Sequence, residues 1–351
     1  MATAAALTTY SNFTDQERAE AAQKMFQIVS GFWLSRAVQV AATLGIPDLL
    51  TDGPRGAADL AAATSTDSDA LYRLLRALAS FGVVREMPGR MFAPTALSDV
   101  LRSDVAGSLR SAAISELGRV HYQSWGNLLD SVKTGQPAFH STFGMDPWQY
   151  FARNPALAAT FNDSMTRLTE VVLRAVTAVY DFTPYRHIID VGGGQGRLLA
   201  GILGQNRAAR GTLFDQPQVI DEARAVLTGD PARERIDLAP GDFFECVPEG
   251  GDLYTLKWII HDWADAEALR ILRNVRCAMS STSRLLLLEV VLPEENKADL
   301  GPLMDLNMLV MTGGRERRAS EFRDLLAGAG LRLARVYATE SPISVVEALP
   351  A

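Results

Sequence analysis

The stretch that constrains the fold most is 187–203, HIIDVGGGQGRLLAGIL, in which two apolar runs flank a cluster of glycines. The first run is short and rich in β-branched residues, which favours a buried strand, whereas the second has helical spacing. Glycine permits left-handed backbone and close approach of a ligand. A strand, a glycine turn and a helix in this order predict a parallel α/β sheet with a ligand at the turn.

The turn fits the dinucleotide fingerprint G-x-G-x-x-G only in part. Gly192 and Gly194 occupy the first two glycine positions, but Arg197 stands at the third, and Gly196 comes one residue early. This pattern lets the backbone approach a ligand without a pyrophosphate along the helix N-terminus. It disfavours a nicotinamide dehydrogenase, which stays as an alternative.

From about Tyr180 onward, seven runs are candidate strands: HIIDVG, GTLFD, RIDLAP, DLYTLKW, RLLLLEVV, LRLARVYA and SPISVVEAL. The first five are far enough apart for intervening helices, which predicts parallel strands with crossover connections. The last two are joined at Thr339-Glu340, which predicts an antiparallel hairpin. Ligands of such sheets bind beyond the carboxyl ends of the strands, so we expect the functional residues there.

The first half of the chain has helical patterns instead. A wide apolar stripe covers Ala21–Leu44, and shorter helices are predicted over Ala57–Ala63 and from near Asp67 to Ser80. A hairpin turned at Pro88-Gly89 follows, and this order is typical of a winged helix. Acidic and basic residues are balanced here, whereas a DNA-binding domain has a basic face. A packing or dimerising role is therefore the better interpretation.

Composition narrows the class of protein further. The chain has 351 residues, 48% of them hydrophobic and 21% charged, which favours two globular domains. A net charge of −7 argues against nucleic acid or an anionic membrane as a partner. The two cysteines lack the spacing of a metal site or a disulfide framework, and the N-terminus lacks the pattern of a signal peptide. We therefore expect a cytoplasmic location.

Two acids follow the second and third candidate strands. Asp215 ends the second strand, where a carboxylate accepts ribose hydroxyls, although it could instead cap the next helix. Asp242 stands beside Phe243 after the third strand, and a carboxylate next to a ring suits the amine and the face of adenine. Alone, Asp242 could be a turn residue. Together with the glycines, these residues describe a nucleoside pocket with little need for phosphates, and S-adenosylmethionine is such a ligand.

Five motifs then follow in order: DVGGGQG, FDQPQVI, GDFFECVPEGGDLYTLKWIIHDWADAEALRILRNV, LLLLEVVLP and GGRERRASEFRDLL. They resemble those of the metal-independent, plant-caffeate-type O-methyltransferases and their bacterial branch that methylates phenolic natural products. The resemblance covers nearly the whole chain. It implies a Rossmann-like seven-stranded methyltransferase sheet over 166–351 and an N-terminal all-helical, winged-helix-like dimerisation domain over 13–165. It also implies a homodimer, S-adenosylmethionine as methyl donor with S-adenosylhomocysteine as product, an aromatic small-molecule acceptor, and no metal ion.

The resemblance also implies site residues. The candidate cofactor residues are Gly192, Gly194, Asp215, Asp242, Phe243, Lys257 and Trp258, with Phe161, Met165 and Thr169 over the methionine end. Candidate residues of the acceptor pocket are Asn307, Met308, Met311 and Asp262, since a methionine-rich wall adapts to varied shapes. Asp262 could instead cap the following helix or support the cofactor site.

The chemistry requires a base, because a phenol titrates near pKa ~10. His261 stands in LKWIIHDWAD, directly after the fourth strand, and aligns with the family's catalytic base. Glu289 and Glu316 match the family acids that flank this base. By its neighbours alone, Glu316 would be a surface charge among Arg315, Arg317 and Arg318.

The other histidines have structural interpretations. We expect His187 to serve the core or the sheet edge, and His121 and His140 to lie at the surface or at helix caps. In HDWADAE, Asp265 and Glu267 are predicted to begin a helix rather than to bind a metal ion. The sheet and cofactor site do not fix the acceptor atom, so carbon or nitrogen methylation and a non-catalytic ligand-binding role remain alternatives.

Overall fold

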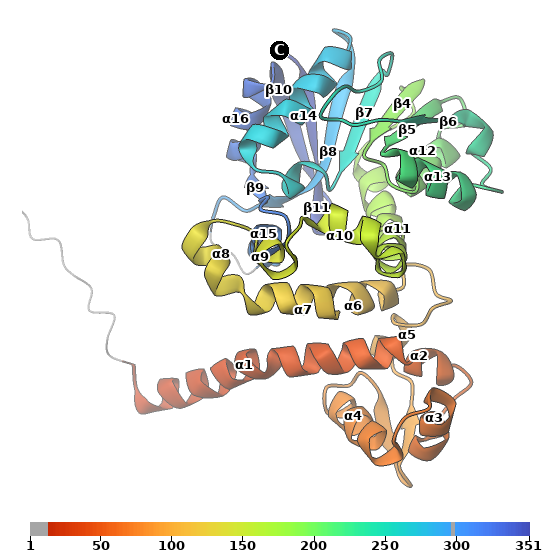
Figure 1. Cartoon of the computed structure of the whole chain (residues 1–351), viewed down its shortest axis with the longest axis vertical. Helices are drawn as coiled ribbons and strands as arrows, with labels where there is room; N and C mark the ends of the chain where they lie inside the picture. Colours follow the sequence, from red (N-terminus) through yellow and green to blue (C-terminus); the bar gives the residue numbers. More distant parts are fainter. Residues whose placement is uncertain (1–12, 296–298) are drawn as a thin grey trace, which may run out of the picture. The chain divides into compact units, whose positions relative to one another are not determined.

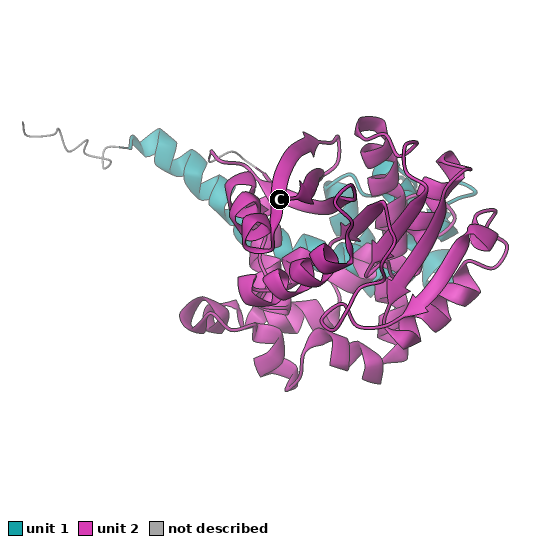
Figure 2. Cartoon of the chain, turned by 90° about the horizontal axis from the view of Figure 1, so that it is seen from above, with its two compact units in different colours: residues 1–101 teal, residues 102–351 magenta. Residues whose placement is uncertain are grey.

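The computed structural model describes residues 13–295 and 299–351, and the chain divides after Leu101 into two compact units (Figure 2). The first unit is mostly helical (Figure 1). Its elements are α1 (Asp15–Thr43), α2 (Ile46–Leu49), β1 (Arg55–Gly56), α3 (Ala57–Thr64), α4 (Ser68–Ser80), β2 (Arg85–Met87), β3 (Met91–Ala93) and α5 (Ala96–Asp99).

Local sequence explains the winged-helix order of this unit. The Asp67 side chain caps α4 by accepting the N–H of Ala70 at 2.8 Å, and Leu71, Leu75 and Leu78 are buried along one face. Strands β2 and β3 pair antiparallel across the predicted hairpin. Strand β1 pairs with β3 on its other side, so the unit contains a small sheet and is not all-helical.

Helix α1 differs from α4, because its large apolar side chains are exposed in the single chain. Phe26 is 65% exposed, Ile28 63% and Trp33 59%, whereas only the small Ala41 and Ala42 of this helix are buried. A contiguous apolar face of this kind is typical of an association surface.

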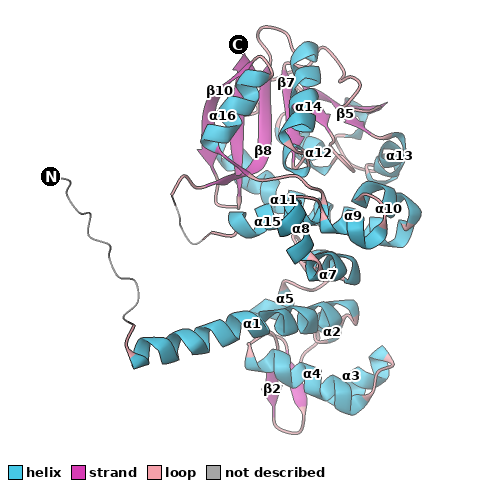
Figure 3. Ribbon diagram, turned by 60° about the vertical axis from the view of Figure 1, so that its left-hand side comes forward, coloured by secondary structure: helices cyan, strands magenta, loops and turns pink. Residues whose placement is uncertain are grey.

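The second unit combines a helical segment with a sheet covered by helices (Figure 3). The helical segment contains α6 (Arg110–Glu116), α7 (Arg119–Gly126), α8 (Leu128–Thr134), α9 (Ala138–Phe143), α10 (Pro147–Arg153) and α11 (Pro155–Val179). The strands are β4 (His187–Val191), β5 (Arg210–Asp215), β6 (Ile236–Pro240), β7 (Leu253–Lys257), β8 (Arg284–Leu292), β9 (Arg317–Arg318), β10 (Leu331–Ala338) and β11 (Ile343–Pro350). The remaining elements are α12 (Arg197–Gln205), α13 (Pro217–Val226), η1 (Arg233–Arg235), η2 (Ile260–Asp262), α14 (Asp265–Ala278), α15 (Gly301–Met311) and α16 (Ala319–Gly328), where η1 and η2 are 3-10 turns.

The strand order confirms the predicted sheet. It runs β10-β11-β8-β7-β4-β5-β6, and the two-residue β9 pairs with β8 outside this path. Strands β4 to β8 are parallel, and β11 is antiparallel to both β8 and β10, as the hairpin prediction requires. All five parallel strands therefore present their carboxyl ends at one edge.

Two apolar layers hold helices on opposite faces of the sheet. Alternate strand residues enter different layers: Ile188 packs with α11, α12 and α13, whereas Ile189 packs with α14 and α16. Leu286 and Leu287 of β8 are divided in the same way. Helices α9, α10 and α15 lie at one end of the sheet (Figures 1 and 3), and α15 contacts β8.

The compact units do not divide at the sequence boundary proposed between 165 and 166. That position lies inside α11, which packs on α6 and on α12 and so joins the helical segment to the sheet. The proposed division of roles between 13–165 and 166–351 stays a prediction. Within the described residues, the helices lack the length and apolar character that crossing a membrane requires.

Candidate functional site

The glycine turn follows β4 and has the left-handed backbone that its sequence predicts. Gly192, Gly194 and Gly196 have φ of 68°, 58° and 79°. A Cβ atom at Gly192 would lie 2.5 Å from Cδ1 of Ile259, so a side chain there would collide with the segment after β7. The turn is therefore an open cradle of backbone beside the ends of β4 and β7.

Arg197 replaces the third fingerprint glycine because its side chain connects two helices. It begins α12, and its Nη2 donates to Oε1 of Glu170 on α11 at 3.0 Å, with Asp230 3.8 Å from Nη1. On the same helix α11, the hydroxyl of Thr166 donates to Oε1 of Gln195 in the glycine turn at 2.9 Å. These contacts fasten α11 to the glycine turn.

The two acids at the next strand ends differ in burial. Both carboxylate oxygens of Asp215 accept backbone N–H groups, from Gly194 at 2.8 Å and from Gln216 at 2.7 Å. Burial raises the pKa of Asp215, and these two hydrogen bonds oppose the rise. Asp242 is exposed and accepts the N–H of Phe244 at 2.8 Å.

Phe243 lies beside the glycine turn. A Cβ atom at Gly192 would be 3.6 Å from its Cε1, and its ring centroid is 6.3 Å from that of Trp263, in an edge-to-face arrangement. Trp263, which was not predicted to be a site residue, packs against the same apolar layer as Phe243. The ring next to Asp242 is thus placed within reach of a ligand in the cradle.

Lys257 and Trp258 mark the end of β7. Lys257 Nζ lies 4.2 Å from the centroid of the Trp258 ring, and burial lowers the pKa of Lys257 to about 8, opposed by Asp190 and Glu289. Trp258 has φ of 54°, a strained conformation for a bulky residue, which is a feature of functional sites. Its indole Nε1 is buried with no hydrogen-bond partner among the described residues.

His261 is carried by the turn η2, directly after that strand end. The side chain is buried, and its Nδ1 lies 2.7 Å from Oε1 of Glu316. Oε2 of Glu289 is 3.9 Å from the same nitrogen, too far for a hydrogen bond. Glu289 instead accepts the N–H groups of Ile259 and Ile260 with its Oε1, at 3.1 and 2.8 Å. Glu316 thus orients the imidazole, and Glu289 holds the turn.

Two buried carboxyls, Glu289 and Glu316, and the partly buried Asp262 lie around this imidazole. Burial raises the pKa of Glu289 to about 7, and the nearby Glu316 adds to the rise while His261 opposes it. Burial also raises the pKa of Glu316 to about 8, where Asp305 adds to the rise and Arg317 opposes it. Oδ1 of Asp262 lies 3.8 Å from Nε2 of His261, and burial raises the pKa of Asp262 to about 7.

The same residues offer a set of metal-ligand atoms. In the described part of the chain, ligand atoms of His261, Glu289 and Glu316 all lie within 4.8 Å of one another. Two ligands of one ion at ~2.1 Å keep about 3 Å or more between them. The 2.7 Å between His261 and Glu316 is shorter, and it fits a direct hydrogen bond better than a shared cation.

The candidate acceptor residues of α15 face an aromatic cluster. Met308 and Met311 are buried, and Met311 packs with Phe139 of α9. Asn307 Oδ1 accepts the indole N–H of Trp125 on α7 at 2.9 Å, a contact that the sequence analysis missed. Partly buried Phe143 and Tyr150 complete this cluster.

The remaining cofactor candidates lie on α11. Phe161 stacks on Phe151 at 4.9 Å between centroids, and the Thr169 hydroxyl donates to the carbonyl of Met165 at 2.6 Å. These contacts run to α10 and within α11. Thr166, which neighbours Met165 on α11, contacts the glycine turn through its hydrogen bond to Gln195.

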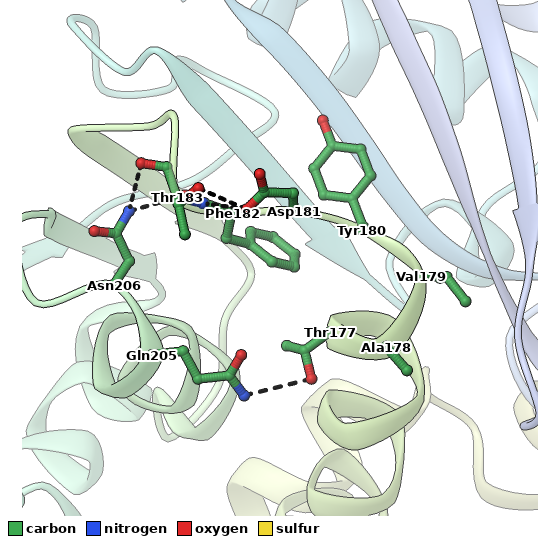
Figure 4. A pocket seen from close by; sticks show the side chains of 9 residues that line it. All are labelled: Thr177, Ala178, Val179, Tyr180, Asp181, Phe182, Thr183, Gln205 and Asn206. Atoms are coloured by element: carbon green, nitrogen blue, oxygen red, sulfur yellow. Dashed lines mark hydrogen bonds between the residues drawn. The ribbon is translucent and has the colours of Figure 1, made fainter.

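A hollow of about 320 Å³ lies elsewhere in this unit (Figure 4). It is formed by residues 177–183 with Gln205 and Asn206. Asn206 Nδ2 donates to the carbonyl of Phe182 at 2.8 Å, and Gln205 donates to Thr177 at 3.4 Å, so side chains of the hollow bond one another (Figure 4). The hollow precedes β4, whereas ligands of such sheets bind after the strands.

Two expectations from sequence are wrong. Asp262 does not cap α14, whose N-cap is Ala264 with no side-chain cap bond. His121 is buried and pairs with Glu116 at 2.9 Å instead of lying at the surface. Arg317, which the sequence did not single out, is 1% exposed. No local pattern marks its burial, because its partners lie in the segment 260–265.

Comparison with known proteins gives matches along most of the chain. An O-methyltransferase domain matches residues 125–332, and an O-methyltransferase dimerisation domain matches residues 26–104. A phenazine O-methyltransferase from Lysobacter antibioticus is 41% identical over 326 residues, which cover 93% of this chain and 95% of that protein. The mitomycin biosynthesis 6-O-methyltransferase from Streptomyces lavendulae is 39% identical over 332 residues, which cover 94% and 95%.

A solved structure of the mitomycin 7-O-methyltransferase has a TM-score of 0.90 at 38% identity and covers 96% of this chain and 100% of that one. Another solved structure is that of an O-methyltransferase from neocarzinostatin biosynthesis, in complex with S-adenosylmethionine and 2-hydroxy-5-methyl naphthoic acid. It has a TM-score of 0.79 at 33% identity and covers 90% of this chain and 96% of that one. An 8-amino-8-demethylriboflavin N,N-dimethyltransferase from Streptomyces davaonensis is 34% identical over 338 residues, which cover 95% and 97%. With both domains matched and relatives above 30% identity over nearly its full length, the chain belongs to the family of S-adenosylmethionine-dependent O-methyltransferases with an N-terminal dimerisation domain.

Proposed function

We propose that this O-methyltransferase methylates a hydroxyl group of an aromatic secondary metabolite, with His261 as general base. The observation that carries the proposal is the buried hydrogen bond of 2.7 Å between His261 Nδ1 and Glu316 Oε1, at the carboxyl edge of the sheet. Relatives named for phenazine and mitomycin methylation support an aromatic acceptor, as does the naphthoic acid in one solved relative.

The cradle after β4 suits the nucleoside of S-adenosylmethionine. A Cβ atom at Gly194 would meet no atom within 4 Å, so the turn is open there, and Asp215 beside it would accept the ribose hydroxyls. Asp242 and Phe243 would meet the adenine amine and ring, with Lys257 and Trp258 at the adjoining strand end. Phe161, Met165 and Thr169 of α11 would enclose the methionine end. When bound, this cofactor supplies a methyl group already activated by a positively charged sulfur.

The protein's own chemistry is the removal of the acceptor proton. A phenol at pKa ~10 is largely protonated at neutral pH, so the base must act as the new bond forms. With its Nδ1–H donating to Glu316, His261 directs an unprotonated Nε2 at the acceptor. The negative carboxylate then stabilises the imidazolium that forms. Glu289 keeps the turn in place during this step.

Asp262 has a separate role in this proposal. It lies 3.8 Å from the proposed basic nitrogen, and a pKa of about 7 leaves a substantial protonated fraction at neutral pH. Where Glu316 is ionised, Asp262 is ionised as well, so Asp262 would orient the acceptor by accepting a hydrogen bond from it beside the base. Asn307, Met308 and Met311 would line the rest of the acceptor pocket.

No metal ion takes part in this mechanism. Turnover should be unchanged after treatment with EDTA, because deprotonation rests on His261 and Glu316. A loss of turnover that Mg²⁺ or Zn²⁺ restores would contradict this part of the proposal and assign the three ligand atoms to a cation.

The exposed face of α1 supports a homodimer. We define this face as Met25, Phe26, Ile28, Val29, Phe32, Trp33 and Val40. Apart from Met25, it lies within the segment 26–104 that matches the dimerisation domain, and a symmetric partner would cover it. Light scattering at micromolar concentration should give twice the mass of 38.1 kDa. A monomeric mass would contradict this assembly.

The acceptor atom is tested with matched substrates. The purified protein, S-adenosylmethionine and pairs of phenols and anilines on the same aromatic frame should give methylated phenols. NMR of each product distinguishes an O-methyl from an N-methyl or C-methyl group. Predominant methylation of the anilines would instead favour N-methylation, the reaction in the name of the relative 8-amino-8-demethylriboflavin N,N-dimethyltransferase.

A further inference from the structure

Arg317 is the largest fully buried side chain in the described residues. A guanidinium is always charged, so its burial is costly unless hydrogen bonds and a counter-ion compensate. The adjacent Arg315 and Arg318 are exposed. Arg317 must therefore have hydrogen-bond acceptors in the interior that its two exposed neighbours do not need.

Those contacts surround the segment that carries His261. Nη1 of Arg317 donates to the carbonyl of Ile260 at 3.1 Å, and Nη2 donates to the carbonyl of Trp263 at 3.0 Å. The guanidinium also donates twice to Oδ1 of Asp265, at 2.7 and 3.1 Å. A planar guanidinium can hold these acceptors at once, which the single nitrogen of a lysine cannot do.

The turn η2 is thereby held from two sides. Glu289 accepts its N–H groups at Ile259 and Ile260, and Arg317 donates to carbonyls on either side of His261. The backbone N–H of Arg315 donates to the carbonyl of His261 itself at 2.8 Å. The turn's backbone therefore has a partner on each face, which fixes the direction of the imidazole.

We propose that Arg317 is a positioning residue for the reaction: its buried guanidinium holds the η2 turn so that His261 meets both Glu316 and the acceptor. This inference rests on the proposed role of His261 as base. Arg317 does not touch the acceptor or the cofactor in this account. It acts through the backbone of the turn and through the position of its neighbour Glu316.

The charge of Arg317 has a second, separable effect. The charged and titratable groups that interact with Glu316 are His261 and Asp262 from η2, Glu289 from β8, Asp305 from α15 and Arg317. Among them, Asp305 raises the pKa of Glu316 and Arg317 lowers it. Loss of the positive charge should therefore leave Glu316 protonated up to a higher pH.

Two substitutions separate position from charge. Arg317→Lys keeps the charge but loses the fork, and misplacement of a catalytic group by about 1 Å costs roughly 10²-fold. We expect kcat to fall by about 10-fold to 100-fold with the acidic limb of the pH profile unmoved. Arg317→Gln should lower kcat similarly and shift that limb to higher pH. Arg318→Lys, an exposed neighbour, is the matched control and should leave kcat within about twofold.

The remaining measurements distinguish positioning from a general structural role. Affinity for S-adenosylhomocysteine should stay near that of the parent, and KM for the acceptor should change less than kcat. The melting temperature of Arg317→Lys should fall, because buried carbonyls of the turn lose a donor, while the protein stays folded at the assay temperature. If Arg317→Lys does not fold, Asp265→Asn, which keeps Arg317 but removes its counter-ion, should show a smaller loss in kcat. Unchanged kcat in both variants, or parallel losses of cofactor affinity, stability and kcat, would overturn the inference.

The double variant Arg317→Lys/His261→Ala keeps this inference distinct from the proposed function. If Arg317 acts through the base, adding Arg317→Lys to His261→Ala should cost no further turnover. If the losses in turnover of the two single variants instead multiply in the double variant, Arg317 does not act through His261. The proposed role of His261 as base would still stand. Near-parental turnover of His261→Ala alone would instead refute the base itself.

Discussion

The two halves of the sheet's carboxyl edge are built differently. At the cofactor edge, the ends of β4, β5 and β6, backbone groups of the turns supply the contacts, and Asp215 accepts the N–H of Gly194 and of its own neighbour Gln216. At the base edge, the ends of β7 and β8 with residues 313–318, side chains far apart in sequence meet, such as His261 and Glu316. The first edge suits binding and the second suits moving a proton, so substitutions at each should change different measurements.

The largest effect is expected at the base edge. Glu316→Gln keeps the shape of the side chain but removes the charge that stabilises a protonated His261. We expect kcat to fall by roughly 10²-fold to 10⁴-fold, the range for a positioned acid–base group. Affinity for S-adenosylhomocysteine, measured by calorimetry, should stay within about twofold.

Glu289→Gln is the comparison within the same edge. A glutamine oxygen can still accept the N–H groups of Ile259 and Ile260, so its loss in kcat should be smaller than that of Glu316→Gln. If the two substitutions cost the same, or if Glu289→Gln costs more, the assigned difference between the two acids is incorrect.

The pH dependence of turnover follows from the protonation of Glu316. Its pKa is raised to about 8, above the ordinary value for a glutamate. As pH falls below this value, the hydrogen-bonded pair of Glu316 and His261 therefore takes up an additional proton. The additional proton can sit on the imidazole, or it can sit on Glu316 and donate to Nδ1. In both cases Nε2 of His261 carries a hydrogen and cannot act as a base. Turnover should therefore rise as pH rises through about 8 and level off above it. A profile that is flat between pH 6 and 9, measured as kcat at saturating acceptor, is the contrary result.

At the cofactor edge, Asp215→Ala should weaken S-adenosylhomocysteine binding by roughly 10-fold to 100-fold, because a charged hydrogen-bond acceptor is lost. Asp215→Asn keeps one acceptor oxygen and should lose less. Calorimetry measures both, and NAD should show no comparable binding to the parent. Unchanged affinity in Asp215→Ala would remove this residue from the cofactor site.

The smallest effect is expected where α11 meets the glycine turn. Glu170→Gln removes the ion pair with Arg197, which is partly exposed, so cofactor affinity should fall by no more than about fivefold. The matched control is Asp237→Asn, which removes the more exposed pair with Arg210 at 3.4 Å and should leave affinity unchanged. Equal effects of the two substitutions would show that α11 is not coupled to the turn.

The sequence predicts the cofactor edge well because its signals are local. The glycines with positive φ and the cap at Asp67 depend on residues a few positions away, and Asp215 is marked by its place at the end of an apolar strand. The strand order also follows from patterns that repeat along the chain, since crossover connections leave few topologies.

The base edge could be predicted only in part. The resemblance to the family pointed to Glu316, whose neighbours alone suggested a surface charge, and its burial comes from packing against His261 and Asp305. Arg317 was missed because Ile260, Trp263 and Asp265, which surround it, are more than 50 residues away. The exposed face of α1 was predicted from its apolar stripe, but a single chain cannot cover it.

The most direct test of the account is the pH dependence of His261→Ala. At neutral pH this variant should bind S-adenosylhomocysteine like the parent and lose turnover by roughly 10²-fold to 10⁴-fold. The loss should shrink as pH approaches the pKa of the phenol, because the acceptor then arrives ionised and needs no base. His140→Ala, at an exposed histidine of the same unit, is the control and should retain parental turnover. A loss that is the same at every pH would reduce His261 to a residue that shapes the pocket, and near-parental turnover at neutral pH would contradict the base outright.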